Sequence, residues 1–305
     1  RRAAPRPAPD RRGVRLGRGP PLRQEGAEVM GVGWLEKGVL IGRGADVGCS
    51  GAYEHTLLQQ SQGHDFRAFV VQGRAPQQAL GVSVRALPGY RRPADLRGRR
   101  VGVSAPGSST QVMASVLLAR AGVDAREVSF VGVGTGATAV AALRTGRVHA
   151  LCHADPIMSL LEHRGEVRLV SDLRTLTAAQ EVFGGAMPAS CLYAPQAFLH
   201  KEPMVAQALT NAIVHALKWL QTASPADLIK AVPASYVLGD RAVYLAAFNR
   251  VRETFSPHGL MPEDGPATTL RALAQAYPHM ASPRVSLPRT FTDDLARKAR
   301  QKFGV

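Results

Sequence analysis

The chain has 305 residues, a length that suits one large domain or two domains of ordinary size. Hydrophobic residues make up 45% and charged residues 20%, which supports a packed core and excludes a chain that is disordered throughout. No stretch approaches the roughly 20 consecutive apolar residues that a membrane-spanning helix needs.

The formal charge of +15 is concentrated at the start of the chain. Residues 1–23 hold eight arginines and one aspartate, without hydrophobic periodicity, and predict a disordered basic tail. A second basic cluster consists of Arg91, Arg92, Arg97, Arg99 and Arg100. Few aromatic residues accompany these arginines, so the stacking surface of a single-strand binder is missing. We therefore expect no nucleic-acid partner.

From about Val29 the chain alternates β-rich runs with helical periodicity. The predicted strands are Ala45–Cys49, Arg67–Val71, Leu80–Val84, Arg99–Ser104, Val128–Val133, Val148–His153, Arg168–Ser171 and Ser190–Ala194. The predicted helices among them are Tyr53–Gln62, Ser109–Ala121 and Thr138–Thr145. Such alternation predicts α/β units on mostly parallel sheets.

After Ala194 the pattern becomes helical. The apolar residues of Pro203–Thr222 fall on one face of a helix. Ser224 then offers an N-cap, followed by a proline at the first helical position. Further helices are predicted over Asp240–Thr254, Glu263–Tyr277 and Asp293–Phe303.

The three cysteines, Cys49, Cys152 and Cys191, each lie in an apolar run and are predicted to be buried small hydrophobic residues. The segment Cys152-His153-Ala154-Asp155 contains soft and hard metal-ligand types close together. Adjacent strand residues point to opposite faces, however, and no second cluster has metal-site spacing. We expect no metal and no cofactor.

The clearest local signal is the loop that follows the predicted strand ending at Ser104. A Pro-Gly turn leads into a helix, and Ser108 and Gln111 have the spacing of a capping box. The backbone N–H groups and hydroxyls of Ser108, Ser109 and Thr110 form a donor cluster suited to a small anion or a carbonyl oxygen. The alternative is that these residues only cap the helix.

A second loop, Gly134–Ala139, fits the loose G-x-G-x-x-[GA] dinucleotide pattern, and Asp155 follows at a distance suited to a ribose contact. A dinucleotide-dependent oxidoreductase is therefore one hypothesis. The short helix that follows favours the alternative, a glycine-rich turn that brings backbone donors to a cleft. Neither an ATP phosphate-binding loop nor a G-x-S-x-G nucleophile elbow occurs in the sequence.

Four segments together resemble a known family in order and spacing. They are Asp95–Thr110, Gly44–Val47 leading to Gly51–Thr56, Gly132–Ala137, and Ala154–Pro156 followed by Asp172–Thr175. The chain resembles the NitT/TauT-type substrate-binding proteins of ABC transporters, which serve nitrate, sulfonate and taurine import. The resemblance runs from about Leu22 to the C-terminus.

The resemblance implies a type II periplasmic-binding fold, in which two α/β lobes with mostly parallel sheets are joined by two crossover strands. The expected divisions are a basic tail at 1–23, lobe one at 24–84 and 195–305, and lobe two at 85–194. The helical C-terminal third would cover lobe one. The arginine–proline tail replaces the usual first strand of the family, so the N-terminus is expected to be atypical or truncated.

The resemblance also implies a function: capture of a small anion of the sulfonate, taurine or nitrate class between the lobes, and delivery to a membrane permease with a separate ATPase. The protein would be a periplasmic monomer without enzymatic activity. The alternative is an enzyme on the same fold. The ligand-binding candidates are Ser50, Gly51 and Tyr53 in lobe one, Ser108, Ser109, Thr110, Gly134, Thr135 and Asp155 in lobe two, and Gly185 before the returning crossover.

Overall fold

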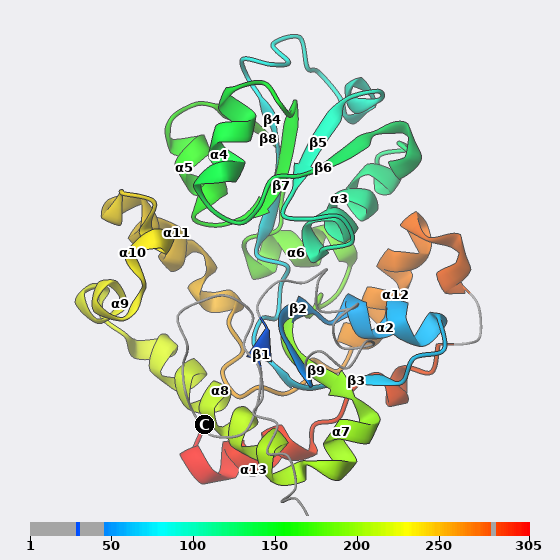
Figure 1. Cartoon of the computed structure of the whole chain (residues 1–305), viewed down its shortest axis with the longest axis vertical. Helices are drawn as coiled ribbons and strands as arrows, with labels where there is room; N and C mark the ends of the chain where they lie inside the picture. The colour runs from blue at the N-terminus through cyan, green and yellow to red at the C-terminus, as the bar shows by residue number, and fades with distance from the viewer. Residues whose placement is uncertain (1–28, 31–45, 282–284) are drawn as a thin grey trace, which may run out of the picture.

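The computed structural model describes residues 29–30, 46–281 and 285–305, so the predicted basic tail lies outside the described residues. Two sheets form two lobes (Figure 1). The four-stranded sheet has the order β1 (Val29–Met30), β2 (Val47–Ala52), β9 (Ser190–Pro195) and β3 (Phe66–Val71). The five-stranded sheet has the order β6 (Ser129–Gly132), β5 (Arg100–Val103), β7 (Ala150–Ala154), β4 (Gln78–Ser83) and β8 (Val167–Asp172).

The predicted α/β fold is confirmed, and strands β4 and β9 connect the two sheets. The chain leaves the four-stranded sheet after β3, enters the other sheet with β4 and returns with β9. The sequence pattern predicts mostly parallel sheets, whereas the two sheets of the structure are mixed. Pairs β1–β2, β5–β6 and β5–β7 are parallel, and every antiparallel pair involves β4 or β9. A strand arriving from the other lobe has no crossover helix to return it in the parallel direction.

The sheets that β4 and β9 join indicate where the lobe boundaries lie. Strand β4 lies within the segment expected in lobe one, yet it pairs with β7 and β8. Strand β9 pairs with β2 and β3. We therefore propose that lobe two comprises residues 78–189, and that lobe one comprises the described residues on either side of it.

The predicted helices correspond to helices of the structure. These are α2 (Glu54–Ser61), α3 (Ser109–Arg120), α4 (Ala137–Arg144), α8 (Pro203–Thr222), α9 (Pro225–Ala231), α11 (Arg241–Val251), α12 (Gly265–Ala276) and α13 (Asp294–Phe303). The structure adds α5 (Ile157–His163), α6 (Leu176–Phe183), α7 (Gln196–Lys201) and α10 (Ala234–Val237). Short 3₁₀ helices occupy Pro93–Leu96, Ala125–Glu127, Arg252–Thr254, Pro278–Ala281 and Leu287–Arg289. As predicted, Ser224 caps α9, and its hydroxyl accepts from the Asp227 N–H.

The resemblance implies that the helical C-terminal third covers lobe one, and in the structure it covers lobe two as well. Helices α8 and α13 pack on lobe one. Helix α12, however, contacts both α2 of lobe one and α3 of lobe two, and α11 packs against α5 (Figure 1). The physical reason is apolar burial, since Leu57, Leu117 and Leu273 belong to one buried cluster that spans the lobes. The lobes are thus held together on both flanks of the crossing strands.

The second basic cluster lies at the outer end of lobe two. Arg100 opens β5, at the end opposite to the edge that faces lobe one, and all five arginines are exposed. Arg97 pairs with Glu127 at 3.0 Å. The Arg100 guanidinium donates to the carbonyl of Arg147 at 2.6 Å.

Two of the cysteines are buried, as predicted: Cys152 and Cys191 are fully inaccessible to solvent. Burial raises the pKa of the Cys152 thiol to about 12, so this residue is a neutral core side chain. The side chain of Cys49 lies outside the described residues. Within the described ranges, no helix combines the length and apolarity required to cross a membrane.

Candidate functional site

The candidate site lies on the edge of the five-stranded sheet that faces lobe one. Strands β5 and β7 run parallel, with Gly102 opposite Leu151, so their carboxyl ends reach the same edge. Strand β4 begins at this edge, because the chain enters it directly from lobe one, and its first residue, Gln78, lies opposite Ala154 (Figure 1). Loops at the carboxyl ends of sheet strands are where α/β proteins usually bind ligands.

The loop after β5 forms the predicted N-terminal cap of α3. The Ser108 hydroxyl accepts from the Gln111 N–H at 3.4 Å. The Gln111 side-chain oxygen accepts from the Gly107 N–H at 2.7 Å, one residue before the position that a standard capping box uses. The predicted cap at Ser108 is confirmed.

Hydroxyl groups tie this loop to the end of β5. Thr110 Oγ1 accepts from the Ser104 N–H at 2.9 Å and lies 2.8 Å from Ser108 Oγ. Ser108 and Thr110 are both buried. Their hydroxyls therefore fix the shape of the loop rather than projecting from it.

The donors left available at this loop are backbone groups. In the first turn of a helix the N–H groups have no intrahelical acceptor. The N–H groups of Ser109 and Thr110 have no hydrogen-bond acceptor within the part of the chain that the structure describes. At the positive end of the α3 dipole, these two donors suit an anionic oxygen.

Gln78 is a further candidate residue at this edge, which the sequence patterns did not indicate. Its side chain is 93% buried, and its amide nitrogen donates to Ser109 Oγ at 3.1 Å. Its amide oxygen is buried and has no hydrogen-bond partner among the described residues. The available signal was a glutamine directly before the apolar run of β4, where a buried amide needs partners.

The glycine loop after β6 is held by two hydrogen bonds. Gly134 adopts a φ of +79°, a conformation that favours glycine. Its N–H donates to the Ser104 carbonyl at 3.0 Å, and its carbonyl accepts from His153 Nε2 at 2.9 Å. Burial lowers the pKa of His153, so the imidazole is neutral and donates through Nε2. Thr135, at the tip of the loop, is exposed.

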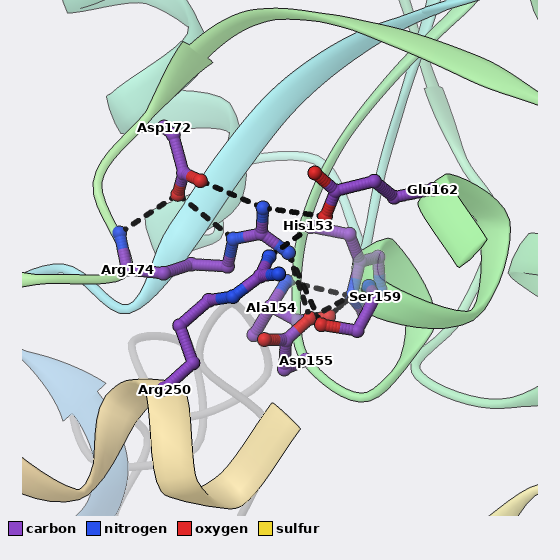
Figure 2. A network of polar contacts seen from close by, with 8 residues as sticks. All are labelled: His153, Ala154, Asp155, Ser159, Glu162, Asp172, Arg174 and Arg250. Carbon is purple, nitrogen blue, oxygen red and sulfur yellow. Dashed lines mark hydrogen bonds and ion pairs between the residues drawn. The ribbon is translucent and has the colours of Figure 1, made fainter. Parts of the chain in front are cut away.

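A network of charged groups lies beside this loop (Figure 2). Arg174 is completely buried and contacts three carboxylates: Asp172 at 2.7 Å, Glu162 at 2.9 Å and Asp155 at 3.3 Å. Arg250 of α11 reaches Glu162 at 2.7 Å. Because α11 belongs to the C-terminal third, this ion pair joins the two lobes.

Arg174 changes the titration of its partners. Burial alone would raise the pKa of Asp172, but hydrogen bonding and ion pairing with Arg174 hold it below the usual value. The pKa of Glu162 is likewise lowered, because contacts with Arg250 and Arg174 outweigh the effect of burial. The same carboxylates raise the pKa of Arg174 although burial opposes this. Asp172, Glu162 and Arg174 are therefore ionised at neutral pH.

Residues 38–226 match the family model described as NMT1/THI5 like. The chain belongs to the NMT1/THI5-like family. A solved structure from Bordetella bronchiseptica RB50 is 48% identical, with a TM-score of 0.87, over 92% of this chain and 87% of that chain. A comparison with curated proteins finds no match.

Two further similar solved structures are those of anion-binding proteins. The alkanesulfonate-binding protein SsuA from Xanthomonas axonopodis pv. citri, bound to MOPS, has a TM-score of 0.58 and 20% identity over 87% of each chain. The periplasmic nitrate-binding protein NrtA from Synechocystis PCC 6803 has a TM-score of 0.59 and 12% identity, over 90% of this chain and 80% of that chain. At this identity they show the fold, and the predicted type II periplasmic-binding fold is confirmed.

The other predicted site residues of this NMT1/THI5-like protein lie nearer lobe one. Ser50 and Gly51 lie in β2, with Gly51 opposite Cys191. Tyr53 is fully buried at the start of α2, and its hydroxyl contacts Thr290 Oγ1. Burial raises the pKa of Tyr53 above its ordinary value, so this phenol is neutral.

Gly185 packs against α12. A Cβ at this position would lie 2.4 Å from Thr268 Oγ1 and 2.6 Å from Asp264 Oδ2, so a larger residue would require these side chains to move. The structure thus brings together the residues 108–110, Gly134 and Asp155 on one edge and leaves Tyr53 and Gly185 in packed surroundings. Ligand contact by any of the ten predicted residues remains a prediction.

Two hollows lie elsewhere on the surface. One, of about 410 Å³, is lined by residues 60–65 and Arg289. The other, of about 230 Å³, lies among α9, α10 and α11. Neither is lined by a predicted site residue. Among the described residues, no group of three or more histidine, cysteine or acidic side chains could hold a metal ion.

Proposed function

We propose that this protein captures a small anionic solute between its two lobes and delivers it to the permease of an ABC importer. The observation that carries the proposal is the pair of available N–H groups at Ser109 and Thr110, on the edge of lobe two that faces lobe one. The shared fold with a sulfonate-binding and a nitrate-binding protein supports it.

The proposed mechanism is capture followed by lobe closure. The two N–H groups replace water around the anion, and they are already oriented because Ser108 and Thr110 hold the loop. Binding energy then comes from preorganised donors rather than from contact area. Movement would occur at residues 72–77 and 184–189, where the chain passes between the sheets. We further propose that the protein acts as a periplasmic monomer with a permease and a separate ATPase.

The proposal favours a binder over an enzyme on the same fold. Asp155 accepts from the Ser159 N–H at 2.8 Å and pairs with Arg174, and these two contacts fix its orientation. His153 Nε2 already donates a hydrogen bond to the Gly134 carbonyl. Neither residue is placed as a mobile acid or base. The dinucleotide pattern at Gly134–Ala139 leads into α4, a helix of only 8 residues. Fluorescence quenching on addition of NADH would show that the protein binds a dinucleotide, and it would contradict the preference for a solute-binding protein over an enzyme.

Calorimetric titration with nitrate, alkanesulfonates and a pyrimidine tests the proposal. We expect heat and a thermal shift with at least one of the anions, and no response to any compound would count against it. The double variant Ser108→Ala and Thr110→Ala should weaken binding by at least about tenfold, because the loop loses the hydroxyl contacts that orient its N–H groups.

A matched control is Ser224→Ala. This change removes the same kind of cap from α9, away from the candidate site. It should leave the affinity for the anion unchanged. Unchanged affinity in the double variant would show that the anion binds elsewhere.

A further inference from the structure

The second basic cluster belongs to a larger basic surface at the outer end of lobe two. Strands β5, β6, β7 and β8 begin at this end and β4 ends there, because β4 pairs antiparallel with both β7 and β8. The segments that meet there are residues 84–100, 120–128, 144–149 and 163–168, which we call the basic end. In Figure 1 the connection between β4 and β5 forms the tip of lobe two, away from lobe one.

The basic end carries the whole net charge of the chain outside the basic tail. It contains twelve arginines and four acidic residues, whereas the remainder of residues 24–305 has 18 basic and 18 acidic side chains. All twelve arginines are exposed. Their field reaches His149, whose pKa is lowered by burial and then by repulsion from Arg100 and Arg99. The positive charge is therefore concentrated at one end of one lobe.

The four acidic side chains leave most of this charge unbalanced. Asp95 accepts from the backbone N–H groups of Arg91 and Arg92 at 2.7 and 3.0 Å. The other three each pair with one arginine, at 3.0, 2.5 and 2.7 Å respectively: Arg97–Glu127, Arg126–Asp124 and Arg144–Glu166. Nine guanidiniums therefore have no carboxylate partner within the described ranges. A surplus of exposed cations on this scale favours an anionic partner outside the chain.

The layout of the basic end favours an extended anionic surface as that partner. The arginines are spread over the ends of five adjacent strands, a width of about 20 Å at the usual strand spacing. The one aromatic residue in these segments, Tyr90, is buried, so the stacking platform of a nucleic-acid binder is missing. Val84, directly after β4, is 42% exposed. An apolar side chain among exposed arginines is typical of a segment that lies in the headgroup layer of a membrane.

We propose that the basic end of lobe two binds the anionic phospholipid surface of a membrane. The guanidiniums pair with lipid phosphates, and Val84 enters the headgroup layer. The attraction acts within about a Debye length of the bilayer. Such binding would keep the protein at the membrane that holds its proposed permease. The solute takes no part in this contact, so experiments with vesicles alone test it separately from the proposed function.

Sedimentation of the full chain with lipid vesicles tests the proposal. One set of vesicles contains equal parts of phosphatidylcholine and phosphatidylglycerol, and the other contains phosphatidylcholine alone. We expect binding to the anionic set only, and at least about tenfold weaker binding when the salt concentration rises from about 0.1 M to about 0.5 M. Absence of binding to the anionic vesicles, or equal binding to both sets, would overturn the proposal.

A triple variant separates the basic end from the basic tail, which stays intact. Arg85→Gln, Arg91→Gln and Arg99→Gln remove three exposed guanidiniums that make no hydrogen bond or ion pair with the described residues. One arginine near an anionic bilayer is worth about a fivefold change in affinity, so the variant should bind the anionic vesicles at least about tenfold more weakly. Because no internal contact is lost, its thermal denaturation should match that of the wild type.

The matched control is Lys201→Gln, Lys230→Gln and Lys298→Gln, which removes the same charge from exposed positions of lobe one. Its affinity for the anionic vesicles should be unchanged. An equal loss in both triple variants would assign binding to net charge and overturn the proposal.

Amide hydrogen exchange of the unaltered chain locates the contact independently. The anionic vesicles should slow exchange in residues 84–99 and leave the basic helix α13 unchanged. Protection confined to residues 1–23 would overturn the proposal.

Discussion

Arg174 is the largest side chain that is fully buried in the described part of the protein. A charge in this position is tolerated only because Asp155, Asp172 and Glu162 surround it. The guanidinium in turn fixes the orientation of Asp155 at the candidate site. The contribution of Arg174 to the free energy of unfolding can be measured separately from ligand binding.

Arg174→Met should lower the free energy of unfolding by about 3 kcal/mol, since the carboxylates lose their buried partner. Urea denaturation followed by circular dichroism measures this change. The control is Arg126→Met, where the arginine is exposed and pairs only with Asp124. That variant should unfold like the wild type. A similarly small effect for Arg174→Met would show that the carboxylates find other partners.

The lowered pKa values of Asp172 and Glu162 predict a pH dependence of stability. A carboxyl whose pKa is lower in the folded state binds fewer protons there than in the unfolded chain. Its contribution is complete above the unfolded pKa of about 4 and is lost as the pH falls through the folded value. Unfolding free energies measured between neutral and acidic pH should therefore fall less steeply in Asp172→Asn. An identical profile in the variant would contradict the pairing with Arg174.

At the scale of elements, the return of the chain to lobe one depends on a close fit between residues 184–189 and α12. Gly185→Ala would place a Cβ against Thr268 and Asp264 and should destabilise the protein by roughly 1–3 kcal/mol. Gly89→Ala is the control, because nothing lies within 4 Å of the added atom. Thermal denaturation of the two variants tests this packing, and equal midpoints would mean that the segment shifts freely.

Most helices and strands could be predicted from local patterns, because residues close in sequence determine where they form. Helix α8 has the predicted bounds Pro203–Thr222, because both its apolar face and the proline at its first position can be recognised within that segment. The cap at Ser108 follows from a spacing of three residues. The direction of β4 and β9 could not be predicted this way, because it depends on which sheet each strand joins.

The site was predicted in part for the same reason. Residues 108–110 and Gly134 stood out because strand, loop and helix adjoin in sequence. The link between Gln78 and Ser109 spans 31 residues, and that between Arg250 and Glu162 spans 88. Contacts between residues so far apart in the chain produce no recognisable local sequence pattern. Tyr53 was predicted as a ligand contact from its place after a strand, and its burial depends on Thr290 and Phe291, far along the chain.

At the scale of the whole molecule, helices α11 and α12 join the lobes on both flanks of the crossing strands. A ligand held between the lobes should therefore stabilise the entire molecule. At a concentration about 100 times its dissociation constant, it should add roughly 2.7 kcal/mol to the free energy of unfolding. Denaturation with increasing ligand measures this gain. A ligand that binds without raising stability would have to bind the unfolded chain equally well, which would contradict a site built by both lobes.

The central claim is that an anion binds the N–H groups of Ser109 and Thr110, and amide proton NMR tests it most directly. Titration with the tightest-binding sulfonate is predicted to give its largest amide shifts at these two residues, and the Ser108→Ala and Thr110→Ala double variant should need at least about tenfold more ligand to reach them. Shifts confined to another region, such as the hollow at residues 60–65, would contradict the claim.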